Sequence, residues 1–186
     1  MDRLLTIPNV ISLLRVACVP LFVYLLFAQD RQVAAAVLLA ILGCTDWIDG
    51  YIARQMDQTS TFGKVADPTA DRLLLGTAVI SLMIIGAIPI WFGLAAVARE
   101  ILIGLGGIYL ALHGHQRLDV RFVGKVGAFS LMISLPLFLL ADADVTGKSI
   151  YLTFAWICGI VGLCFSWYSA LGYFQRAKEK LSQVSS

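Results

Sequence analysis

The chain has 186 residues, of which 59% are hydrophobic and 14% are charged, whereas a soluble domain normally carries roughly 25% charged residues. With a mean hydropathy of +0.84, this composition indicates a membrane protein without a separate soluble catalytic domain, because each span takes roughly 20 residues. The formal net charge is only +2 and there is no basic run, so we predict no nucleic-acid partner.

Six apolar stretches are long enough to cross a bilayer as helices. Charged residues or glycine and proline separate them, and no internal repeat or long linker interrupts the chain. We therefore expect residues 1–186 to form a single all-α domain, with six transmembrane helices in one bundle. The predicted helices cover residues 8–28, 32–54, 62–86, 89–113, 121–141 and 148–175.

Basic residues gather near one set of predicted helix ends, whereas only Arg31 and Lys148 fall near the other. Because short basic loops stay on the cytoplasmic side, we expect both termini to be cytoplasmic. The first apolar stretch has no cleavage pattern, so we expect it to be retained in a multi-pass protein typical of a bacterial inner membrane. The gathered residues are Arg3, Arg54, Lys64, Arg117, Arg121, Lys125, Arg176, Lys178 and Lys180.

Four aspartates interrupt the second and third predicted helices. Asp46 and Asp49 are three residues apart, and Asp67 and Asp71 are four apart, so each pair shares one helix face. A short connection makes the two helices antiparallel, which brings both pairs together near the cytoplasmic surface. Four such charges need cations to stay ionised, and oxygen ligands suit Mg²⁺ or Mn²⁺. A metal pair of this kind is a recurrent solution for phosphoryl transfer.

Small residues continue the aspartate face of the second helix. Gly50 lets a ligand or another helix approach the backbone, and Arg54 could bind a phosphate or pair with a carboxylate. Spacing alone does not separate catalysis from divalent-cation transport. The outer halves of the helices carry almost no polar groups, which argues against a permeation path, and a structural scaffold does not explain four intramembrane acids.

The four aspartates belong to a longer motif that resembles the signature of the CDP-alcohol phosphatidyltransferases, with every fixed position present. The segment from Asn9 to Arg15 also resembles the first helix of that family. The motif reads Asp46-x-x-Asp49-Gly50-x-x-Ala53-Arg54, then eight residues, then Gly63-x-x-x-Asp67-x-x-x-Asp71.

This resemblance implies a homodimeric enzyme that transfers a phosphatidyl group from CDP-diacylglycerol to an alcohol and releases CMP. It implies that Asp46, Asp49 and Asp67 bind two metal ions, while Asp71 binds one of them and acts as the general base. The implied donor-binding residues are Asn9, Val10, Ile11, Ser12, Gly50, Arg54 and Ser60.

The sequence identifies the acceptor substrate less clearly than the donor. The segment from Asp67 to Arg72 resembles the bacterial glycerophosphate branch of the family, which implies glycerol 3-phosphate as acceptor and phosphatidylglycerophosphate as product. An anionic acceptor needs a positive pocket, for which Arg99, Arg121 and Lys125 are the candidates.

Two observations keep other interpretations of the acceptor site open. Arg99 could simply pair with an acid, and Arg121 and Lys125 could be basic anchors at the membrane surface. The Thr and Gln that often follow Gly124-Lys125 in phosphatidylglycerophosphate synthases are missing here. Phosphatidylglycerol, in a reaction like that of cardiolipin synthase, is therefore an alternative acceptor.

Overall fold

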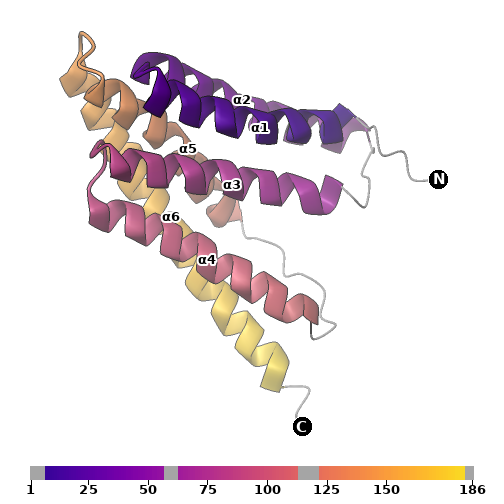
Figure 1. Ribbon diagram of the computed structural model, residues 1–186. Helices are drawn as coiled ribbons and strands as arrows, with labels where there is room; N and C mark the ends of the chain where they lie inside the picture. Colours follow the sequence, from indigo (N-terminus) through magenta and orange to yellow (C-terminus); the bar gives the residue numbers. More distant parts are fainter. Residues whose placement is uncertain (1–6, 57–62, 113–121, 183–186) are drawn as a thin grey trace.

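A computed structural model describes the backbone of residues 7–56, 63–112 and 122–182 and the side chains of residues 14–45, 72–105 and 123–172 (Figure 1). The described backbone is all-α, with six α-helices that match the predicted stretches closely, and this confirms the predicted fold class at the level of helix number and order. The elements are α1 (Ile7–Val23), a π-helical turn η1 (Tyr24–Ala28), α2 (Gln32–Met56), α3 (Gly63–Ile84), α4 (Ile90–Leu112), α5 (Phe122–Asp142) and α6 (Lys148–Ser182).

Two helices differ in detail from the sequence prediction. The first stretch changes to a π-helical turn after Val23, where the Gln29 amide bonds the Tyr24 carbonyl at 3.2 Å. The last helix extends to Ser182 rather than to residue 175. Hydropathy predicts only the apolar part of such a helix, because the charged turns that continue it carry no apolar signal.

Tight turns at one end of the bundle explain where the helices stop. Gly86, between α3 and α4, has φ +78°, and Gly147, just before α6, has φ +94°. These backbone conformations favour glycine. The predicted breaks at these glycines are therefore places where the chain reverses direction.

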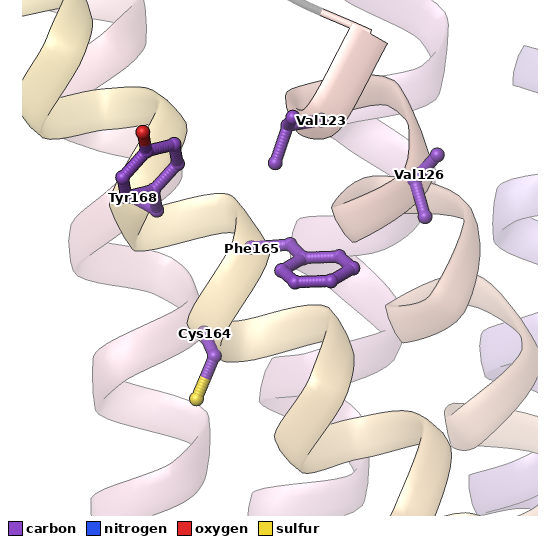
Figure 2. A pocket seen from close by; sticks show the side chains of 5 residues that line it. All are labelled: Val123, Val126, Cys164, Phe165 and Tyr168. Atoms are coloured by element: carbon purple, nitrogen blue, oxygen red, sulfur yellow. The ribbon is translucent and has the colours of Figure 1, made fainter.

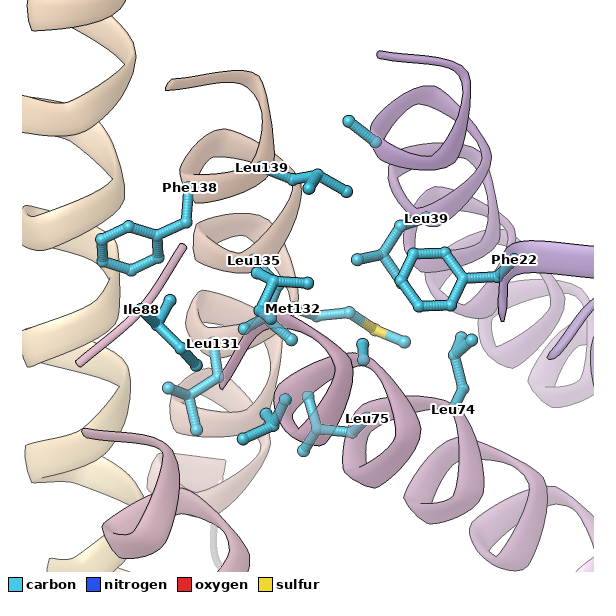
Figure 3. Close-up of a cluster of buried hydrophobic side chains, with 14 of the residues drawn as sticks. Phe22, Leu39, Leu74, Leu75, Ile88, Leu131, Met132, Leu135, Phe138 and Leu139 are labelled. Atoms are coloured by element: carbon cyan, nitrogen blue, oxygen red, sulfur yellow. The ribbon is translucent and has the colours of Figure 1, made fainter. Parts of the chain in front are cut away.

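The helices pack in an order that differs from their order in the chain. Helix α6 packs along α5, α2 packs on α5, and α1 packs against α3, while α4 contacts both α3 and α6 (Figure 1). The apolar core contains residues from all six helices, with Phe92 on α4 and Ala155 on α6 among them. Figure 3 shows its part around Phe22, Leu39, Leu74 and Leu135.

The α5–α6 crossing brings two backbones into direct contact. A Cβ atom on Gly162 would lie 2.7 Å from the backbone nitrogen of Leu131, and one on Gly127 would lie 2.7 Å from that of Ser166. Real Cβ atoms do not approach backbone this closely, so the crossing requires glycine at both positions. Small residues at helix crossings are the usual way in which membrane helices approach each other.

Two helices within the described residues are long and apolar enough to span a membrane, namely Val123–Asp142 and Lys148–Gly172. Shorter apolar helices in the same part of the chain are Leu14–Ala28, Gln32–Thr45 and Arg72–Ile84. The prediction of six transmembrane helices is therefore supported by length for α5 and α6, and it stays a prediction for the other four.

Candidate active site

The backbone places the two aspartate pairs at the same end of the bundle. Asp46 and Asp49 lie in the C-terminal half of α2, and Asp67 and Asp71 lie in the first turns of α3. Helix α2 ends on the side where α3 begins, as Figure 1 shows. The side chains of all four aspartates fall outside the described residues, so their metal ligation stays a prediction. Within the described part, no group of three or more His, Cys, Asp or Glu side chains could hold a metal.

Six of the seven predicted donor-binding residues belong to helices that reach the same end. Asn9, Val10, Ile11 and Ser12 lie in the first turns of α1, which begins beside α3 (Figure 1). Gly50 and Arg54 lie on α2, on the part that also carries the first two aspartates. Ser60 falls outside the described residues, as do the side chains of the other six, so donor binding also stays a prediction.

The three predicted acceptor-binding residues do not share one environment. Arg99 on α4 is buried, with 5% of its surface exposed. Lys125 on α5 is exposed, and Arg121 falls outside the described residues. Of these three residues, the structure therefore places Arg99 inside the bundle, and no ion pair or hydrogen bond among the described residues joins it to Lys125.

Arg99 belongs to a cluster of three charged side chains that links α3 to α4, which we call the arginine–glutamate cluster (Arg72, Arg99 and Glu100). The Arg99 Nη1 donates to Glu100 Oε1, and Arg72 Nε lies 3.8 Å from Glu100 Oε2. The carboxylate thus pairs each of its oxygens with a different arginine. The idea that Arg99 pairs with an acid is confirmed, and Glu100 is that acid.

Burial separates the two arginines of the cluster. The side chain of Arg99 is 6% exposed and that of Glu100 is 14% exposed, whereas that of Arg72 is 42% exposed. The buried Arg99 Nε has no hydrogen-bond partner among the described residues. Among the described side chains, two guanidinium groups and one carboxylate leave this cluster a net charge of +1, and a buried guanidinium group favours an anionic partner.

Neither Arg72 nor Glu100 is predicted as a site residue from the sequence. The sequence could have indicated both residues, because a charged side chain inside an apolar helix marks a functional position by default. Arg72 directly follows Asp71 in α3, so the cluster lies close in the chain to the predicted general base.

A separate groove opens between the first turns of α5 and the middle of α6 (Figure 2). Its volume is about 630 Å³, and it is lined by Val123, Val126, Cys164, Phe165 and Tyr168. These side chains are apolar except for one hydroxyl and one thiol, so the groove lacks the acids and bases that phosphoryl transfer needs. It is not the predicted active site.

Comparison with known proteins gives the family. The sequence profile of the CDP-alcohol phosphatidyltransferases matches residues 5–168. The chain is 36% identical over 178 residues to cardiolipin synthase (CMP-forming) of Streptomyces coelicolor, covering 92% of this chain and 82% of that protein. It is 34% identical to a putative cardiolipin synthase of Mycobacterium bovis, covering 87% of this chain and 78% of that one.

A third relative has another acceptor in its name. The CDP-diacylglycerol--glycerol-3-phosphate 3-phosphatidyltransferase of Bacillus subtilis is 30% identical over 190 residues, covering 94% of this chain and 96% of that protein. All of these matches favour an enzyme over a cation transporter or a scaffold. With a profile match over most of its length and a signature complete at every fixed position, the chain belongs to the CDP-alcohol phosphatidyltransferase family.

Proposed function

We propose that this enzyme transfers the phosphatidyl group of CDP-diacylglycerol to phosphatidylglycerol, which yields cardiolipin and CMP. Family membership already gives the reaction class, phosphatidyl transfer to an alcohol in phospholipid biosynthesis at a membrane. The observation that carries the choice of acceptor is the higher identity to cardiolipin synthases, 36% and 34%, than to the Bacillus subtilis glycerol-3-phosphate enzyme, 30%.

This acceptor replaces glycerol 3-phosphate, which the segment around Asp67 predicts, as the leading candidate. The residues after Gly124-Lys125 also fit the change, because the Thr and Gln typical of phosphatidylglycerophosphate synthases are absent. Glycerol 3-phosphate is the second candidate. The observation in its favour is the match to the Bacillus subtilis enzyme, which covers 96% of that protein's length.

The aspartates of α2 and α3 suit a divalent metal, because two antiparallel helices carry only oxygen ligands to one end of the bundle. Asp46, Asp49, Asp67 and Asp71 would hold two ions, Mg²⁺ or Mn²⁺. Such ions, when bound, neutralise the charge of the donor's pyrophosphate.

The proposed chemistry needs one base and one leaving group. The carboxylate of Asp71 takes the proton of the acceptor hydroxyl. The acceptor oxygen forms a bond to the phosphorus that bears diacylglycerol, and the bond from that phosphorus to CMP breaks with its electrons leaving on CMP. Asn9 to Ser12, Gly50, Arg54 and Ser60 hold the donor's nucleotide and phosphates while its acyl chains remain in the bilayer.

The proposed topology follows from the same arrangement. Six spans with both termini in the cytoplasm would put the aspartate end of α2 and α3 on the cytoplasmic side, where the donor's cytidine headgroup and the released CMP are in water. From the family resemblance, we further propose that the enzyme is a homodimer in the cell membrane.

Replacing Asp67 with Ala is expected to weaken metal binding rather than proton transfer. Loss of one carboxylate ligand raises the Mg²⁺ concentration needed for half-maximal activity, or abolishes activity at any concentration. Titration of activity with MgCl₂ measures this. The matched control is Asp144→Ala, since Asp144 is an exposed acid at the opposite end of the bundle, paired only with Lys148 at 3.4 Å among the described residues. If the activity of Asp67→Ala depends on MgCl₂ concentration in the same way as that of the control, Asp67 has a structural role and does not bind the metal.

A competition experiment tests the acceptor. Purified protein in lipid nanodiscs receives CDP-diacylglycerol, Mg²⁺ and equal concentrations of phosphatidylglycerol and glycerol 3-phosphate, and the lipid products are separated by chromatography. The proposal predicts that cardiolipin is the main product. Phosphatidylglycerophosphate as the main product would make the second candidate correct.

A further inference from the structure

We propose that the groove between α5 and α6 binds one acyl chain of an anionic phospholipid from the surrounding bilayer, with the phosphate of that lipid at the basic turns that end α6. This groove is then a second lipid site, apart from the one where the substrates react, and its role does not depend on which alcohol is the acceptor. We call it the α5–α6 groove (Val123, Val126, Cys164, Phe165 and Tyr168).

The α5–α6 groove opens on the side of α5 that faces away from the aspartates. Helix α2 lies beside Met132 of α5, because a Cβ atom on Gly43 would lie 3.2 Å from Met132 Cγ. Val123 precedes Met132 by nine residues, about two and a half helical turns, so it lies on the opposite side of α5. Asp46 and Asp49 belong to α2, and α5 therefore separates them from a lipid chain in the groove.

The groove is apolar and open to its surroundings. Its volume of about 630 Å³ falls within the roughly 300–1,000 Å³ of sites that hold small ligands, and the exposed fractions of Phe165 and Tyr168 are 42% and 60%. Figure 2 shows the Phe165 ring extending from α6 toward α5. Within the described residues, α5 and α6 are the two helices long and apolar enough to span a membrane, so the groove borders the hydrocarbon of the bilayer.

A single acyl chain suits this space better than a helix from a second copy. Packed helices keep their axes about 8–10 Å apart, so a second helix would lie across the hollow and leave it unfilled. An unfilled hollow loses the dispersion contacts of the side chains that line it. A flexible hydrocarbon chain enters the groove and restores those contacts.

The charge of the headgroup selects the lipid. Contacts with hydrocarbon do not by themselves favour one lipid, because acyl chains are as apolar in the bilayer as in the groove. Helix α6 continues past the apolar stretch that ends at Gly172 and reaches Ser182. These last turns carry three basic residues against one acid, namely Arg176, Lys178 and Lys180 against Glu179.

The basic turns follow directly from the groove. Arg176 comes eight residues after Tyr168, so the two residues lie on the same face of α6. Clusters of basic residues just beyond a membrane span attract anionic headgroups. A phospholipid whose chain lies in the groove therefore has its phosphate near the turn that carries Arg176.

Photo-crosslinking tests the site. Purified protein in phosphatidylcholine nanodiscs, without donor or Mg²⁺, receives phosphatidylglycerol that carries a diazirine in one acyl chain. After irradiation, mass spectrometry of peptides locates the attached lipid. We expect attachment to concentrate on residues 123–126 and 164–168, and we expect unlabelled phosphatidylglycerol to displace the probe whereas added phosphatidylcholine does not.

Replacing Arg176 with Gln should lower attachment at the groove about fivefold, the effect of one basic residue beside an anionic headgroup. Arg176→Lys keeps the charge and should retain attachment. The matched control is Lys148→Gln, because Lys148 is an exposed basic residue at the other end of α6. Its loss should leave attachment unaltered.

A tryptophan tests the space itself. Val126→Trp fills the groove and should reduce attachment. Ile133→Trp should not, because Ile133 is on the same helix, is 39% exposed and does not line the groove. Arg176 lies beyond the apolar stretch, so its variants keep the test available if Val126→Trp fails to fold.

Attachment that spreads evenly over lipid-facing positions such as Ile133, or that is unchanged in Arg176→Gln, would overturn the inference, because an ordinary lipid shell then covers the groove. A disulfide that joins the Cys164 residues of two copies under oxidation, with no lipid attached at the groove, would overturn it as well, because a second copy then covers the groove. In each case the product of the unmodified enzyme is unaffected, so the proposed function stands.

Discussion

Replacing Asp71 with Asn is expected to lower kcat by about 10²–10⁴-fold, the range typical of general-base catalysis. An amide is nearly isosteric with a carboxylate, but it cannot accept the proton of the acceptor hydroxyl. CMP release under saturating donor and acceptor measures kcat. Donor binding, measured with CDP-diacylglycerol analogues that lack a transferable group, should change much less than turnover.

The control for Asp71→Asn is Asp144→Asn, which makes the same chemical change at an exposed acid in the turn before α6. It should leave turnover unaltered. If Asp71→Asn retains turnover within about tenfold of the unmodified enzyme, Asp71 is not the base.

The second large effect is expected at the crossing of α5 and α6. A methyl group added by Gly162→Ala would lie 2.7 Å from the Leu131 nitrogen and 3.0 Å from the Gly127 oxygen. These neighbours are backbone atoms, which cannot rotate away as a side chain can. The two helices must separate, with a cost of about 1–3 kcal/mol or more. Thermal unfolding in detergent should show a fall of several degrees in Tm.

Gly76→Ala in α3 is a matched control, because a Cβ atom there has no neighbour within 4 Å. The same substitution in open space should leave Tm unchanged or raise it slightly, since alanine is the better helix former. Equal Tm values for the two variants would show that the close α5–α6 contact does not limit stability.

The helices themselves could be predicted from the sequence because the thickness of a bilayer fixes the length of each apolar run. The break at Gly86 is one such success, since glycine permits the φ of +78° observed there. The end of α6 could not be predicted in this way. Its last turns are charged, and charged residues outside the bilayer do not distinguish a helix from a loop.

The packing order could not be read from the sequence either. In a soluble bundle, polar residues mark the outer face of each helix, but here the lipid-facing side is apolar as well. Ile101 on α4 is 54% exposed and Ile103 on the same helix is 8% exposed, although the residue is the same. The pairing of α2 with α5 and of α1 with α3 therefore comes only from the structure.

The candidate site, too, was only partly predictable from the sequence. The spacing of the aspartates predicts their common faces on α2 and α3, and the backbone carries them to one end of the bundle. The partnership of Glu100 with Arg72 joins residues on different helices, and no periodicity within one helix reveals it.

The most direct test of phosphatidyl transfer at the aspartate motif is the release of CMP by the purified protein. With CDP-diacylglycerol, phosphatidylglycerol and Mg²⁺ together, we expect one CMP for each cardiolipin formed, and no release when the alcohol or the metal is omitted. Folded protein that releases no CMP with either phosphatidylglycerol or glycerol 3-phosphate, or that releases equal amounts when Asp46, Asp49, Asp67 and Asp71 are all replaced with Ala, would contradict it.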